Sequence, residues 1–410
     1  MTRLRSHPRP GRIGGVRLHQ LVLLEAAGAL VLVAWAAHRA LLVPAAVVAA
    51  LLVLVAALRR RGRPALEWCA TALALRARLR AARRPWSAEG VDPVLAPVLE
   101  CAGALRTYTY RDRKRERGIG MVGDGSFLTA LLLVQARNEP LRAERAARPL
   151  ELGLLYEALE VDGVRLESAQ VVQHTRPAPG PRLPQDSPAT RSYASLQAAS
   201  GTPAVRLTWI ALKLDPALCP EAVRARGGGL GGAQRALLRA ADQLASRLAA
   251  AGFEVSLLSE EQVVSALATS AGVSAQAVPP GAGPDGPDGP VRRTAESGRA
   301  WRCDDRWHTT YWVGRWPRLG AGAAASAELV ALLTSAPAPV STFSLTVSRG
   351  TGGAPAVTGH VRLTAHGAQE LAGAGRRLER AARGAKVGLV RLDREQLPGV
   401  LATLPLGGVR

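Results

Sequence analysis

Two long apolar runs lie close to the start of the chain. They cover residues 18–37 and 40–58, and only His38 and Arg39 clearly separate them. A helix needs about 20 apolar residues to cross a bilayer. The pattern therefore predicts a transmembrane hairpin of two helices joined by a tight turn.

Arginines lie on both sides of this predicted hairpin. Five of them occur in the tail of residues 1–17, and four follow the second run at Arg59, Arg60, Arg61 and Arg63. Positively charged residues near membrane spans are retained on the cytoplasmic side. We therefore expect a multi-pass protein of the cell membrane, with both termini and the whole remaining chain in the cytoplasm.

Two further features belong to this N-terminal region. Residues 59–84 mix arginines with leucines, which predicts a basic juxtamembrane helix lying on the inner leaflet or packed on the soluble domain. Glu25 interrupts the first apolar run. An ionisable residue there predicts contact with a partner, unless its carboxylate reaches the aqueous boundary or is protonated.

The pattern changes to short apolar strands and longer helices in residues 85–410, which predicts a layered α/β cytosolic domain with a mixed sheet. Residues 105–110, 119–122 and 127–135 are predicted strands, and Asp124-Gly125 is a hairpin signal between the last two. The charged run 111–117 is expected to be a solvated loop. Segments rich in proline, at 176–203 and 272–291, are predicted to be flexible insertions.

An internal repeat is visible in the second half of the chain. Its copies begin at Val205 and Val361, each with the letters VRLT, and each continues with a long helix, a short strand and a second helix. The second helices begin after Ser259 and Asp393, both followed three residues later by glutamine, which fits a capping box. We predict a duplicated β-α-β-α unit with at least some parallel strands.

Charge and cysteine content narrow the class of protein. The 410 residues include 53 basic and 32 acidic ones, for a net charge of +21, but lysine occurs only at three positions. We attribute the charge mainly to arginine-rich coding and to membrane topology, with anionic lipid as the alternative partner and no nucleic acid expected. The four cysteines are widely spaced, which predicts neither disulfides nor a zinc site and fits a reducing compartment.

Candidate chemistry is sparse, and no cofactor is predicted. The glycine run 226–232 precedes a helix, but it lacks the lysine and hydroxyl residue of a phosphate-binding loop, so we interpret it as a flexible loop. Asp304-Asp305 is an adjacent acidic pair of the kind that could hold a metal. It lies in a basic, aromatic segment without further ligands, and a carboxylate pair alone is a weak metal signal. No catalytic residue is predicted.

Aromatic residues concentrate between residues 301 and 316. This segment holds four of the eight tryptophans, together with Tyr311. It is interpreted either as a buried strand or as a docking surface, because Trp, Tyr and Arg dominate interface hot spots. Strand alternation predicts Trp307 and Tyr311 as the buried set, and Trp312 and Trp316 as the docking set. The candidate partner interface is therefore Trp312, Arg315 and Trp316, with Glu25 in the first apolar run.

Several strings resemble a known family. The N-terminal hairpin, VVQHTRP at 171–177, LTWIALKLDP at 207–216, WRCDDRWHTTYW at 301–312 and GLVRLD at 388–393 look like the type VII secretion protein EccE. The resemblance implies a non-enzymatic subunit of the type VII (ESX) secretion core complex, beside EccB, EccC and EccD, that stabilises the assembly around the export motor. It also implies a cytosolic domain likened to glycosyltransferase folds. The alternatives are a membrane-anchored degenerate glycosyltransferase-like enzyme or an adaptor that binds anionic lipid.

Overall fold

The computed structural model describes most of the chain, in two compact units. The described residues are 5–6, 12–13, 16–38, 42–57, 59–60, 63–84, 92–111, 118–136, 149–176, 188, 205–274, 292–317, 323–334, 340–350 and 353–408. One unit comprises residues 7–85, and the other comprises residues 1–6 and 86–410. The predicted loop 111–117 and both predicted insertions lie almost wholly outside the described residues.

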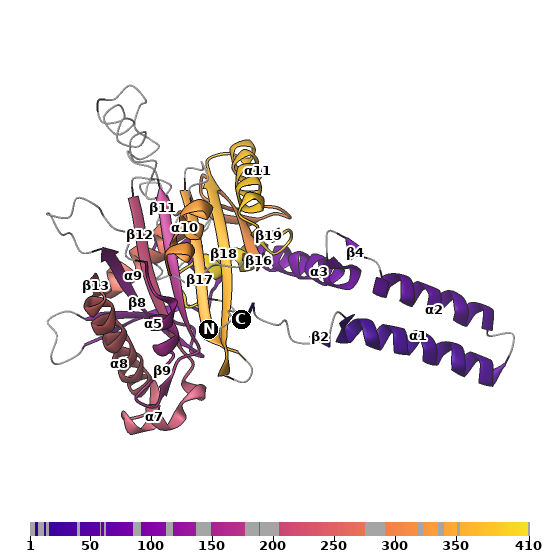
Figure 1. Cartoon of the computed structure of the whole chain (residues 1–410), viewed down its shortest axis with the longest axis horizontal. Helices are drawn as coiled ribbons and strands as arrows, with labels where there is room; N and C mark the ends of the chain where they lie inside the picture. Colours follow the sequence, from indigo (N-terminus) through magenta and orange to yellow (C-terminus); the bar gives the residue numbers. More distant parts are fainter. Residues whose placement is uncertain are drawn as a thin grey trace. The chain divides into compact units, whose positions relative to one another are not determined.

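The smaller unit is helical. Its helices are α1 (Leu18–Ala37), α2 (Leu42–Ala57) and α3 (Ala65–Ala82). Short strand pairs precede and follow the first two helices: β2 (Arg12–Ile13) with β3 (Val16–Arg17), and β4 (Arg59–Arg60) with β5 (Arg63–Pro64). The helices α1 and α2 pack side by side as the predicted hairpin, and α3 matches the predicted basic helix (Figure 1).

The transmembrane character of this hairpin is not supported. Within the described residues, no helix combines the length and the apolar character that a membrane crossing requires. The helix α2 is 16 residues long where the prediction had a span over 40–58.

The described part of the larger unit is built on one sheet of thirteen strands. Ten form a continuous path, in the order β14-β15-β16-β18-β17-β11-β12-β8-β7-β6. Along the chain these are β6 (Arg106–Tyr110), β7 (Ile119–Gly123), β8 (Leu128–Ala136), β11 (Ser168–Arg176), β12 (Val205–Leu214), β14 (Thr294–Glu296), β15 (Trp301–Cys303), β16 (Arg306–Arg315), β17 (Val340–Arg349) and β18 (Pro355–Ala365). Beside this path, β13 (Phe253–Leu257) pairs with β8, β19 (Gly388–Arg391) with β16, and β1 (Arg5–Ser6) with β18.

The sheet contains a duplication with the predicted order of elements and with more elements than the sequence indicated. The two VRLT strings are not equivalent, however, because Val205 begins β12 whereas Val361 is the seventh residue of β18. Read from its two ends, the order of strands is the same: β6-β7-β8-β12-β11 corresponds to β14-β15-β16-β18-β17. The halves meet where β11 pairs with β17. In each half, a strand is followed by a long helix and then by a short strand, as β12-α8-β13 and as β18-α11-β19. The two strands pair with opposite edges of a central strand, which is β8 in the first half and β16 in the second. The domain is therefore an internal duplication.

The expectation of parallel neighbours is corrected by this topology. The two strands of each repeat unit do run parallel to each other, but an antiparallel strand separates them. Neighbouring strands of the main sheet are consequently antiparallel throughout the described residues, except for the two-residue pairing of β1 with β18. The domain is a mixed α/β fold around a large antiparallel sheet.

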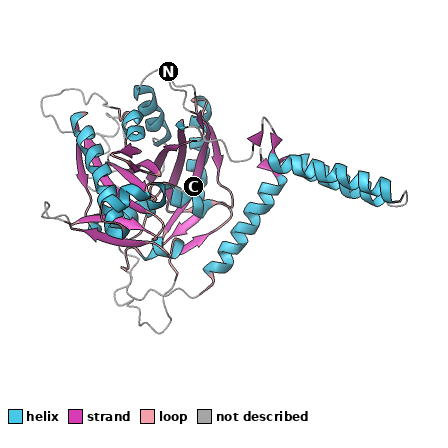
Figure 2. Cartoon of the chain, turned by 90° about the horizontal axis from the view of Figure 1, so that it is seen from below, coloured by secondary structure: helices cyan, strands magenta, loops and turns pink. Residues whose placement is uncertain are grey.

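Helices cover both faces of the sheet (Figure 1, Figure 2). One face packs against α5 (Leu152–Glu157), α8 (Gly229–Ala250), α10 (Ala323–Thr334) and α11 (Ala368–Gly384), and forms the larger apolar core. The other face packs against α4 (Ala96–Cys101), α9 (Glu260–Ala271) and α12 (Gln396–Thr403), with a smaller core. The remaining elements are the hairpin of β9 (Glu160–Val161) with β10 (Val164–Arg165), the turn η2 (Pro216–Leu218) and helix α7 (Pro220–Ala225).

Two local predictions were right and one was wrong. Ser259 and Gln262 form the expected capping box of α9, and Asp124 accepts hydrogen bonds from Ser126 and Phe127 in the expected turn. The second capping box does not form. Asp393 instead bonds Arg391, and the side chain of Gln396 enters the sheet, where its oxygen accepts from the backbone N–H of Thr310 at 2.8 Å.

Candidate functional site

The tryptophan segment is largely part of the core. Trp301 and Tyr311 are each 2% exposed, whereas Trp307, Trp312 and Trp316 are half-buried. The ring of Trp301 lies 4.9 Å from that of His308, between centroids. Burial raises the pKa of Tyr311 well above its usual range. Of the two residues predicted to be buried, Tyr311 is deeply buried and Trp307 is half-buried. Trp301 is also deeply buried.

The proposed docking residues do not share one face of the sheet. Tyr311 and Val313 point into the larger core, which places Trp312 on the opposite face. The register then shifts between Val313 and Arg315. As a result, the ring of Trp316 turns back to the larger core and lies against Gly359. Arg315 is exposed at the end of β16, and whether Trp312, Arg315 and Trp316 contact a partner stays a prediction.

The two residues of the acidic pair, Asp304 and Asp305, have different surroundings. Asp304 has a φ of 52° in the turn between β15 and β16, and its carboxylate accepts from Arg293 Nε at 2.7 Å and Nη2 at 2.8 Å. It also accepts from the backbone N–H of Ser274 at 2.9 Å. Asp305 is half-exposed, with Arg306 Nε at 3.5 Å. Asp304 therefore holds the turn together, and no group of three metal-binding side chains exists in the described chain.

A second buried carboxylate extends this network. Glu100, at the end of α4, accepts from the backbone N–H groups of Arg293 and Thr294, both at 2.8 Å, and from the Thr294 hydroxyl. The adjacent Cys101 thiol has its pKa raised to about 12 by burial, so it is protonated at neutral pH. These residues attach α4 to the edge strand β14, which is a structural role.

The glycine run forms the junction between α7 and α8. Gly227, Gly228 and Gly229 all have positive φ, and α8 begins at Gly229. The guanidinium of Arg235 folds back over this turn and donates to the carbonyl of Arg226 at 2.6 Å. The glycines therefore allow a sharp turn between the helices α7 and α8, which agrees with the interpretation of this run as a loop.

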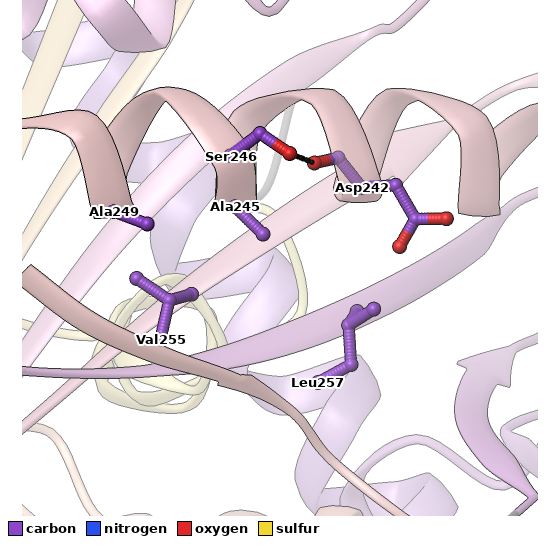
Figure 3. Close-up of a pocket in the computed structure, with 6 residues that line it drawn as sticks. All are labelled: Asp242, Ala245, Ser246, Ala249, Val255 and Leu257. Carbon is purple, nitrogen blue, oxygen red and sulfur yellow. Dashed lines mark hydrogen bonds between the residues drawn. The ribbon is translucent and has the colours of Figure 1, made fainter. Parts of the chain in front are cut away.

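A shallow open pocket lies between α8 and β13 (Figure 3). Its volume is about 400 Å³, and it is lined by Asp242, Ala245, Ser246 and Ala249 of α8 and by Val255 and Leu257 of β13. The Ser246 hydroxyl donates to the Asp242 carbonyl at 3.0 Å. The small apolar walls and the single carboxylate do not assemble a reaction centre.

The helix pair α1–α2 has the most unusual surface of the described chain. Among the side chains of α1 and α2 that the structure describes, the buried ones are all alanines: Ala27, Ala34, Ala45 and Ala49. Its large apolar side chains point outward, including Leu32, Val33 and Trp35 on α1 at 66–70% exposure. Glu25 is also exposed on α1. The side chains of the flanking Arg59, Arg60, Arg61 and Arg63 lie outside the described residues.

Sequence reasoning missed one buried cluster. Arg362 on β18 is fully buried, with His308 on β16 and His174 on β11 also buried on the same side of the sheet. Arginine is so frequent in this chain that no sequence signal could separate Arg362 from the many others. Only the pairing of the strands brings these three residues together.

Comparison with known families gives a match over part of the chain. Residues 202–313 match the family model described as "EccE: Putative type VII ESX secretion system translocon, EccE". The matched segment runs from the start of β12 into β16, and so includes α8, β13 and α9. The match covers about a quarter of the chain and supports the resemblance to EccE-family type VII secretion proteins seen in the sequence. A comparison with curated proteins gave no match.

We expect the two aspartates to respond differently to substitution. Asp304→Asn keeps a side chain that tolerates positive φ but removes the charge that pairs with Arg293, so it should cost about 3 kcal/mol of unfolding free energy. Asp305→Asn should change that free energy by less than about 0.5 kcal/mol, because its ion pair is half-exposed. Thermal unfolding of the full chain measures both. Equal effects of the two substitutions would contradict the structural role of Asp304.

Proposed function

We propose that this chain is a non-enzymatic subunit of the type VII (ESX) secretion core complex, held at the cytoplasmic membrane by its N-terminal helix pair. The observation that carries this proposal is the surface of α1 and α2. Helices in water bury their large apolar residues, whereas helices in lipid pack through small residues and turn large ones outward. The alanine contact between α1 and α2 follows the second pattern.

The exposed apolar side chains of α1 and α2 are expected to contact lipid or protein rather than water. Among the described side chains, six large apolar residues on α1 and six on α2 are exposed: Val22, Leu24, Leu30, Leu32, Val33, Trp35, Val43, Val47, Val48, Leu51, Val53 and Leu54. A contiguous apolar surface of this kind marks contact with a membrane or another protein. We propose that lipid and the helices of neighbouring subunits share it, with both chain ends in the cytoplasm as the flanking arginines indicate.

Several observations favour a structural role over catalysis. Asp304 is bound to Arg293, and the pocket beside α8 holds one carboxylate. Among the described strands of the main sheet, the only parallel neighbours are β1 and β18, over two residues, whereas α/β enzymes bind nucleotides at the ends of several parallel strands. A degenerate glycosyltransferase is therefore the weaker alternative. Anionic lipid is kept as a partner of the basic helix α3, and EccB, EccC and EccD as the protein partners.

Membrane attachment is tested by placing charges on the outer surface of the helix pair. We expect Val33→Asp combined with Val47→Asp to release the protein from the membrane pellet, because each buried carboxylate costs about 3 kcal/mol in the bilayer centre. Ser246→Asp on α8 is the matched control, since it adds a charge outside the helix pair. If the double variant still sediments with membranes after high-salt washing, the helix pair is not the attachment.

Orientation is tested with introduced cysteines, because Cys219 and Cys303 are buried and report poorly. In a chain whose four cysteines are replaced by serine, Glu254→Cys on the exposed side of β13 should resist a membrane-impermeant maleimide in intact cells. It should react after permeabilisation. Ala37→Cys, at the turn of the hairpin, should react in intact cells. Reaction of Glu254→Cys from outside would reverse the proposed topology.

Docking is tested on the tryptophans. On native electrophoresis of detergent extracts, we expect the chain to migrate in a megadalton-scale assembly. Trp312→Ala should shift it towards the free protein, with binding weakened by about 2 kcal/mol or more, a thirtyfold loss. Trp301→Ala, in the core, should instead cost roughly 3–5 kcal/mol of stability. Assembly that is unchanged by Trp312→Ala would remove Trp312 from the interface.

A further inference from the structure

Arg362 is buried without a charged partner. Its Nη2 donates to the carbonyl and hydroxyl oxygens of Ser270, at the C-terminal end of α9. That end of a helix carries a partial negative charge, which favours a cation. The other two nitrogens, Nε and Nη1, have no hydrogen-bond partner among the residues that the structure describes. Only one of the three guanidinium nitrogens therefore has a hydrogen-bond partner in the described structure.

The residues around Arg362 are uncharged. Burial lowers the pKa of His174 to about 3 and that of His308 well below its usual value, so both imidazoles are neutral. Burial raises the pKa of the Cys303 thiol, which stays protonated. Burial also lowers the pKa of Arg362 to about 9, still above neutrality. The cluster therefore carries one uncompensated positive charge.

Further unused polar groups lie beside it. Thr310 is directly opposite Arg362 in the pairing of β16 with β18, so their side chains project from the same face. The Thr310 hydroxyl has no partner in the described structure, and neither has His308 Nε2. The other imidazole nitrogen of His308 bonds the Thr364 hydroxyl at 2.9 Å. When that hydroxyl donates, Nε2 carries the proton and becomes a donor.

The duplication supplies an internal comparison. Leu131 opposite Ala211 corresponds to Thr310 opposite Arg362, because each pair lies three residues from the end pair of its ladder, Leu128 with Leu214 or Trp307 with Ala365. The short strands confirm the equivalence: the N–H of Leu258 bonds Leu131, and that of Leu392 bonds Thr310, both at 3.0 Å.

The first half fills this position with an apolar core. Leu131 and Ala211 are fully buried among the residues packed under α9. The same arrangement of strands and helices is therefore stable without a charge there. An unpaired buried charge costs several kcal/mol, so the guanidinium in the second half calls for a compensating ligand rather than a structural explanation.

We propose that Arg362 and Thr310 bind a small monovalent inorganic anion, of the size of chloride, between the sheet and the helices α9 and α12. Guanidinium and hydroxyl donors suit an anion, and the full burial of both residues limits the ligand to a small one. The ion accepts from one of the two unpartnered nitrogens of Arg362, whose N–H groups point to different sides of the guanidinium, and from the Thr310 hydroxyl. This site does not depend on the proposed role in secretion.

The test is thermal unfolding of the purified full-length chain in bromide, with gluconate replacing it at constant ionic strength. We expect the melting temperature to rise with bromide concentration and then to level off, as a saturable site requires. Arg362→Met should abolish this dependence. Arg239→Met is the matched control, because Arg239 is an exposed arginine paired with Asp162 at 2.7 Å. It should keep the dependence of the wild type.

A second variant keeps the test decisive if Arg362→Met does not fold. Thr310→Val removes one donor and leaves the charge, so the bromide concentration that gives half of the stabilisation should rise roughly tenfold. A wild-type melting temperature that is the same in bromide and gluconate would overturn the proposal. So would an equal bromide response in Arg362→Met or an unchanged half-saturation in Thr310→Val.

Discussion

The pairing of β11 with β17 is the constraint on which the large domain depends. It is the contact that merges two similar halves into one sheet, and it continues without interruption from Ser168 opposite Ser348 to Thr175 opposite Ser341. Antiparallel pairing at this junction places equivalent elements of the halves on the same side of the sheet. Consequently α8 and α11 cover one face, and α9 and α12 cover the other.

Contacts across that junction make the halves interdependent. The buried amide of Gln170, in the first half, donates to the carbonyl of Ala402 and accepts from the N–H of Gly407, both in the second half. In the other direction, Arg362 reaches from β18 to the end of α9. These hydrogen bonds replace water for groups that are fully enclosed, so separating the halves would leave each of them unsatisfied.

The two halves share one arrangement of strands and helices but differ in the side chains packed between them. Under α9 the sheet presents leucine, alanine and tryptophan, while the corresponding area of the second half presents threonine, histidine and arginine. The helix pair α1–α2 shows a similar inversion, since its small residues are inside and its large ones outside. Neither arrangement follows from stability in water alone, and the proposed contacts with lipid or partner helices and with an anion would account for both.

Sequence periodicity alone determined the local elements: the helix pair, the basic helix α3, the capping box at Ser259 and the order of elements in each repeat. These depend on residues close in the chain, whose spacing carries the signal. It also located the tryptophan segment, but not the register shift after Val313 that separates Trp312 from Trp316. A bulge depends on how neighbouring strands twist, which the letters of one strand do not encode.

Only the tertiary structure decided the rest. It placed an antiparallel strand between the parallel strands of each repeat, paired Asp304 with Arg293, and collected Arg362, Thr310 and His308 on one buried face. These residues come from segments far apart in the sequence, and arginine and threonine carry no positional signal by themselves. What makes Arg362 distinctive is the loss of water around it, and burial is set by the packing of α9 and α12 over the sheet.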